Sequence, residues 1–130
     1  MKLVNLATAG LVTSILSILA GAIVRATGSG DGCGASWPTC NGKVLPSLNT
    51  TSEIIEFSHR SISGILLIIT LLLFIKSKDQ GTPSLHKKII NYLTFFVLLE
   101  ALIGAVIVIY EWVGLNLSLI HISEPTRLRR

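Results

Sequence analysis

Three long apolar stretches restrict what this chain can fold into. They cover residues 3–24, 54–75 and 89–109, and a helix needs roughly 20 such residues to cross about 30 Å of hydrocarbon. In lipid, backbone polar groups must be satisfied within their own segment, so we expect helices in all three stretches. Only 14% of the residues are charged, and the mean hydropathy is +0.68. The sequence therefore predicts an all-α membrane protein with three transmembrane helices.

Positive charge is concentrated between the second and third stretches. The connection over residues 76–88 carries four lysines and one acidic residue. The positive-inside rule places this connection in the cytoplasm, and Lys2 places the N-terminus on the same side of the inner (plasma) membrane. The connection over residues 28–53 is then extracytoplasmic. The basic residues form no stripe interleaved with aromatic residues, so we expect no nucleic-acid partner.

The first stretch permits two interpretations. Lys2, the apolar core and the small residues 20–22 resemble a cleavable secretory signal. However, the stretch is long for a signal core. It also carries a stripe of small residues on one helical face: Gly10, Ser14, Ser17 and Gly21. We interpret it as a retained helix whose small residues allow close packing against another helix.

Ionisable side chains open the second stretch, and such groups at a membrane helix suggest a functional site. At about 100° per residue, a group of polar side chains projects within an arc of roughly 100°. The members of this arc are Glu56, His59, Arg60 and Ser63. We expect the arc to face the helix bundle, while Ile65, Leu66, Ile69 and their neighbours can meet lipid.

A neutral imidazole such as that of His59 is a common axial ligand of haem iron. Arg60, together with Arg25 at the outer end of the first stretch, could pair with haem propionates. The alternative interpretation is structural: Glu56 and Arg60 form an ion pair one helical turn apart, with a histidine at the helix interface. The spacing of these residues does not decide between the two.

The extracytoplasmic connection contains both cysteines of the chain, Cys33 and Cys40, where a disulfide can persist. Their C-x6-C spacing around Trp37 differs from the CxxC pattern of zinc sites and thiol-exchange centres. We expect a glycine-rich loop closed by a disulfide, with Trp37 at the membrane interface. A structural clasp is the favoured interpretation, and a redox role stays open because an exposed, strained disulfide is reducible.

Taken in order, three segments resemble the haem A synthase family. They are GAIVRATGSG at residues 21–30, the C-x6-C loop around Trp37, and EFSHR at residues 56–60. The resemblance covers residues 1–116. It implies eight helices in two pseudo-repeated four-helix bundles, of which this chain would hold three helices of the incomplete first bundle, on the haem o side.

The resemblance also implies an activity and residue roles. Such an enzyme oxidises a methyl group of its substrate, haem o, to a formyl group, giving haem a for terminal oxidases. Glu56 is similar to the catalytic carboxylate, His59 to an axial ligand of the substrate iron, and Cys33 and Cys40 to the loop disulfide. A haem b is implied for the C-terminal half, and a haem o synthase and an electron donor are implied as partners.

Two other classes of function stay open. A non-enzymatic b-type cytochrome would need a second histidine facing His59. A quinone-linked disulfide oxidoreductase would use Cys33 and Cys40. Product analysis separates the first alternative from a synthase, because only a synthase converts haem o to haem a.

Residues 117–130 depart from this pattern. Their sequence back-translates to a transposase end used in sequencing libraries, so we expect an adapter-derived tail; a genuine basic tail is the alternative. His121 lies in this segment and is not counted as the second haem ligand. Without the fourth helix, its ligand and the second bundle, the chain alone is expected to be inactive.

The third stretch carries a carboxyl group, that of Glu100, near its middle. An ionised carboxylate is costly at this depth, so we expect the group to be protonated or hydrogen-bonded inside the bundle. A polar packing group is favoured over a proton relay.

Overall fold

The computed structural model describes residues 2–47, 49–78 and 81–110 and contains three helices. They are α1 (Leu3–Ala26), α2 (Thr51–Ser77) and α3 (Ser84–Ile109). Each is long and apolar enough to cross a membrane. The prediction of an all-α, multi-pass membrane protein is confirmed. The predictions about the adapter-derived tail and His121 lie outside the described residues.

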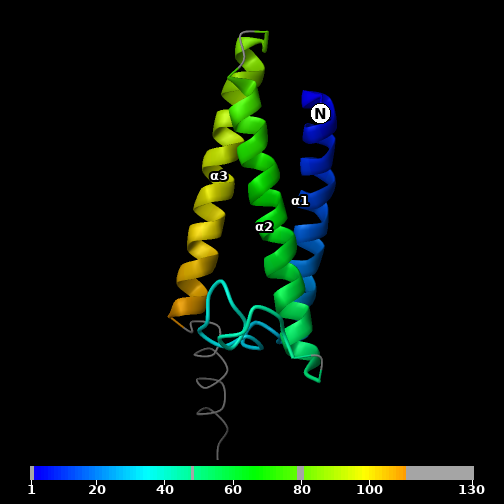
Figure 1. Cartoon of the computed structure of the whole chain (residues 1–130), viewed down its shortest axis with the longest axis vertical. Coiled ribbons are helices and arrows are strands. Elements are labelled where there is room, and N and C mark those ends of the chain that lie inside the picture. Colours follow the sequence, from blue (N-terminus) through cyan, green and yellow to red (C-terminus); the bar gives the residue numbers. More distant parts are fainter. Residues whose placement is uncertain (1, 48, 79–80, 111–130) are drawn as a thin grey trace, which may run out of the picture.

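Helix α2 lies between the other two helices (Figure 1). Both α1 and α3 pack on α2, whereas the backbones of α1 and α3 do not approach each other within the described segments. The loop over residues 27–50 lies at the end of the molecule where α1 ends and α2 begins. The connection between α2 and α3 lies at the opposite end, together with the N-terminus. This is the arrangement that the predicted topology requires.

The helices are longer than the apolar stretches that predict them. Helix α2 begins at Thr51 instead of Ile54, and α3 begins at Ser84, directly after Pro83, instead of at Ile89. The connections cover residues 27–50 and 78–83, instead of the predicted 28–53 and 76–88. Hydropathy marks the part of a helix that lies in hydrocarbon, and backbone hydrogen bonding continues beyond it into polar residues.

A glycine turn ends α1. The N–H of Gly28 donates to the carbonyl of Arg25, and the N–H of Ser29 donates to that of Val24. This pair of bonds is a Schellman motif, which needs a left-handed residue after the cap. Gly28 supplies it with a φ of +63°. The motif turns the chain sharply out of α1 and into the cysteine loop.

The stripe of small residues on α1 packs against α2, as predicted. A Cβ added at Gly10 would lie 3.5 Å from Cγ2 of Ile69. Further along, the hydroxyl oxygens of Ser17 and Ser63 are 2.8 Å apart. Small side chains therefore set the distance between the two helices along most of their contact.

The prediction that Leu66 faces lipid is wrong. Its side chain is 8% exposed, and it lines the same cavity as Ser63, one turn earlier. Residues three apart share a helix face, and α1 covers this face at Ser63. The buried arc of α2 is therefore wider than the polar residues alone indicate.

Candidate functional site

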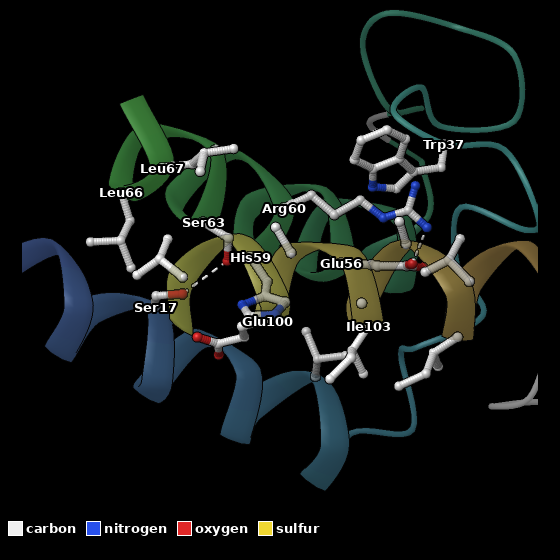
Figure 2. Close-up of a pocket in the computed structure, with 18 of the residues that line it drawn as sticks. Ser17, Trp37, Glu56, His59, Arg60, Ser63, Leu66, Leu67, Glu100 and Ile103 are labelled. Carbon is white, nitrogen blue, oxygen red and sulfur yellow. Dashed lines mark hydrogen bonds and ion pairs between the residues drawn. The ribbon is translucent and has the colours of Figure 1, made fainter. Parts of the chain in front are cut away.

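A cavity of about 420 Å³ opens among the three helices and the cysteine loop (Figure 2). This volume is within the range of small-molecule sites. Most of the wall is apolar and comes from α2 and α3, and Gly30 and Trp37 contribute from the loop. The polar side chains on the wall are Ser17, Glu56, His59, Arg60, Ser63 and Glu100. The predicted polar arc of α2 therefore faces the cavity.

The imidazole of His59 packs directly against α1. A Cβ added at Gly21 would lie 3.1 Å from Cε1 and 3.5 Å from Nε2 of the ring. Within the described part of the chain, His59 makes no hydrogen bond, and its Nδ1 is buried without a partner. Packing thus holds the ring, while its nitrogens have no protein partner. An imidazole nitrogen without a protein partner can serve as an axial ligand of haem iron.

Glu56 and Arg60 join α2 to the cysteine loop. They form an ion pair with each other, and Oε2 of Glu56 accepts a hydrogen bond of 2.7 Å from the backbone N–H of Cys33. Nη1 of Arg60 donates to the backbone carbonyls of Ser36 and Thr39, at 2.7 and 2.9 Å. Glu56 is almost fully buried, at 3% exposure. These charge-assisted bonds are stronger than neutral ones.

The ion pair predicted by the structural interpretation is therefore present. Both terminal nitrogens of Arg60 already bind protein groups, so propionate binding by Arg60 stays a prediction. Arg25 is exposed near the end of α1 and is not part of the cavity wall. Its predicted role in propionate binding also stays a prediction, and the structure does not bring it together with His59.

The cysteine loop is closed by a disulfide between Cys33 and Cys40. The two residues are 0% and 1% exposed. A short backbone bridge between Cys40 and Lys43 continues the loop, and Trp37 reaches the cavity wall while remaining 52% exposed. The burial of both sulfur atoms supports the structural clasp.

The carboxylate of Glu53 anchors the base of the loop. Its Oε2 accepts a hydrogen bond of 2.8 Å from the N–H of Ser47, and its Oε1 accepts one of 3.1 Å from the side chain of Asn41. Unlike Glu56, Glu53 does not line the cavity. The first turns of α2 thus carry two carboxylates that hold the loop, and only one of them faces the cavity.

Two residues of the cavity wall lay outside the site predicted from the sequence. Glu100, predicted to be a polar packing group, shares the cavity wall with His59. Ser17, predicted only to bring helices together, also lines the wall. Gly21 is not part of the wall but lies against His59. The available signal was the small-residue stripe, whose members Ser17 and Gly21 lie opposite Ser63 and His59 of the polar arc.

His86 lies in the first turn of α3, and its side chain is exposed. The cavity wall on α3 is formed by residues 97–108, near the other end of the helix. Of the histidines in the described segments, His59 alone lines the cavity.

Residues 4–54 match the model of the Cytochrome oxidase assembly protein family. The chain is 39% identical over 123 residues to Heme A synthase of Macrococcus caseolyticus, and 42% identical over 111 residues to Heme A synthase of Staphylococcus epidermidis. These matches cover 88% and 82% of this chain. It is also 40% identical over 120 residues, 90% of its length, to Protoheme IX farnesyltransferase of Thermus thermophilus. No solved structure was found to match the chain.

The chain spans only part of these relatives. It covers 40% and 37% of the two heme A synthases and 19% of the Thermus protein. The predicted resemblance is confirmed: over most of its own length this chain is similar to the heme A synthases.

Proposed function

We propose that this chain is the substrate-binding part of a haem A synthase, which oxidises a methyl group of haem o to a formyl group and so supplies haem a to terminal oxidases. The observation that supports this most directly is the position of His59. Its imidazole lies on the wall of an intramembrane cavity without a protein partner, beside the buried carboxylate of Glu56. The names of the relatives support the same reaction.

In this proposal His59 binds the iron of the substrate through Nε2, and the cavity holds the flat ring system. Glu56 lies one turn earlier on α2 and is fixed by Arg60 and by the N–H of Cys33. It accepts a proton from the methyl carbon or stabilises positive charge that develops there. With water as the source of the oxygen atom, the step R–CH3 + H2O → R–CHO + 4 H⁺ + 4 e⁻ releases electrons that an electron-transfer partner must accept. A haem b in another part of the full-length protein belongs to the same proposal.

The proposed setting is the inner (plasma) membrane, with the cysteine loop and the mouth of the site on the extracytoplasmic side. The lysine-rich connection between α2 and α3 supports this orientation. A farnesyltransferase that acts on protohaem IX is the proposed source of the substrate, in line with the name of the Thermus relative.

Replacement of Glu56 in the full-length protein that carries this sequence tests the assignment. We expect Glu56→Ala to lower haem a formation by about 100-fold, the scale of a general acid–base contribution, while haem o stays bound. Glu53→Ala is the matched control, because Glu53 also holds the loop but does not line the cavity. Chromatography of extracted haems measures both products.

The outcomes separate catalysis from loop anchoring. Equal losses in the Glu56 and Glu53 variants would show that Glu56 acts only by holding the loop. If Glu56→Ala formed as much haem a as the wild type, Glu56 would not be the catalytic carboxylate. His59→Ala should abolish binding of haem o, and retention of bound haem o in that variant would contradict the proposal.

A further inference from the structure

The hydroxyl groups of Ser17 and Ser63 are bonded in an unusual way for this chain. Six other helical hydroxyls donate to the backbone carbonyl four residues earlier: those of Thr8, Thr13, Ser58, Ser61, Thr70 and Thr94. Ser17 and Ser63 instead bond to each other across the contact between α1 and α2, at 2.8 Å. One hydroxyl donates to the other, so the second hydrogen has no acceptor among the described residues.

Glu100, on the third helix, lines the same cavity as these hydroxyls, and it is exposed in the structure. In Figure 2, Ser17, Ser63, His59 and Glu100 gather toward one end of the cavity, away from Trp37 and the loop. Within the described segments the carboxyl of Glu100 has no hydrogen bond and no ion pair. A carboxyl group at the middle of a membrane span is costly without a partner. This end of the cavity therefore offers an unused hydroxyl hydrogen and an unused carboxyl.

With the carboxyl of Glu100 as the acceptor, a ligand group that satisfies both must accept one hydrogen bond and donate another. A carbonyl only accepts and an ammonium only donates, whereas an alcohol does both. We propose that Ser17, Ser63 and Glu100 form a subsite that binds an alcohol group of the substrate. The alcohol accepts from the serine pair and donates to Glu100.

This inference rests on the proposed function and deepens it. Haem o carries an alcohol on the side chain that bears its isoprenoid tail, where protohaem carries a vinyl group. A single axial bond to His59 leaves the ring system free to rotate about that bond. A second anchor at the alcohol removes this freedom and selects which edge of the ring faces Glu56.

The test compares two haems in the full-length protein, reconstituted in nanodiscs with its proposed haem b site already filled. Haem o and protohaem are each titrated and followed by their Soret absorbance. We expect the wild type to prefer haem o. Ser63→Ala and Glu100→Leu should each weaken haem o binding by about threefold to tenfold, the scale of one hydrogen bond, and leave protohaem binding within about twofold. Ser61→Ala is the control, because its hydroxyl bonds to Phe57 and does not line the cavity.

Protohaem binding reports that each variant is folded. Glu100→Gln keeps the shape of the side chain, so it checks that the effect of Glu100→Leu does not come from a change of shape. Equal weakening of both haems, or no weakening of either, would overturn the alcohol subsite; the latter is the result expected if only water bridges these groups. Protohaem and haem o binding that does not depend on His59 would instead contradict the proposed function. The two failures are therefore distinguishable.

Discussion

The carboxylate of Glu56 accepts a hydrogen bond from the backbone N–H of Cys33 across 2.7 Å. This contact links the wall of the cavity directly to the disulfide loop. Arg60 strengthens the link, because it binds Glu56 and two loop carbonyls at once. The loop and the first turns of α2 therefore form one unit, and changes in the loop should reach the site.

Replacement of Arg60 by lysine should loosen this unit. A lysine ammonium cannot reproduce the planar fork that binds a carboxylate and two carbonyls together. We expect Arg60→Lys to lower the free energy of unfolding by about 2 kcal/mol, since bonds to charged groups are among the stronger ones. Thermal unfolding in detergent measures the change.

Arg25→Lys provides the matched control. Arg25 is exposed and its side chain makes no hydrogen bond or ion pair with the loop in the described residues, so its replacement should change stability by less than about 0.5 kcal/mol. If Arg60→Lys unfolded at the same temperature as Arg25→Lys, the guanidinium would contribute nothing to holding the loop.

The disulfide should protect the loop from proteolysis. Both sulfur atoms are buried, so mild reductant should leave the native bond intact, and removal of both cysteines should cost about 2 kcal/mol for a loop this short. Lys43 is exposed directly beside Cys40. We expect trypsin to cleave after Lys43 much faster in the Cys33→Ser, Cys40→Ser double variant, as measured by mass spectrometry. Equal cleavage of both forms would argue against the clasp.

Gly32 allows the loop to lie on the first turn of α2. A Cβ at this position would be 2.6 Å from the backbone carbon and oxygen of Ser52, a contact that only backbone movement can relieve. Gly32→Ala should therefore cost about 2 kcal/mol or more, on the scale of overpacking. Gly81→Ala is the control because nothing lies within 4 Å of its Cβ position. A stable Gly32→Ala protein with an unchanged melting temperature would contradict this close approach.

Local patterns predict much of this architecture. Hydropathy locates all three helices, and the small residues on α1 correctly indicate a close helix contact. The spacing of Glu56 and Arg60 also allows their ion pair. Each of these features depends on residues within one helix or on a property of one helix face.

Features that depend on the path of the loop or on a third helix could not be predicted in this way. The bonds from Arg60 to Ser36 and Thr39 require the folded loop. The burial of Leu66 depends on which side of α2 is covered by α1, and the place of Glu100 on the cavity wall depends on how α3 packs. A sequence pattern gives the relative directions of side chains on one helix but not the neighbour that each side meets.

The predicted orientation in the membrane can be tested with two cysteine variants. Val44 in the loop and Leu85 at the start of α3 are 79% and 65% exposed, so both positions are open to a maleimide. The native cysteines do not react because they are bonded to each other. With a membrane-impermeant reagent on intact cells, we expect Val44→Cys to be labelled and Leu85→Cys to be labelled only after lysis. Labelling of Leu85→Cys in intact cells, with Val44→Cys labelled only after lysis, would show that the topology is the opposite of the predicted one.

The close packing of Gly21 against His59 gives the sharpest test of the haem site. A methyl group at Gly21 would press on the imidazole at 3.1 Å, which is closer than ordinary contact, whereas one at Gly10 would meet Ile69 at 3.5 Å. Both Gly→Ala changes raise helix propensity, by up to about 1 kcal/mol, so neither should unfold α1. We expect Gly21→Ala to shift the Soret band and weaken haem binding by about tenfold, and Gly10→Ala to do neither. If both variants bound haem like the wild type, His59 would not be the ligand that this packing holds in place.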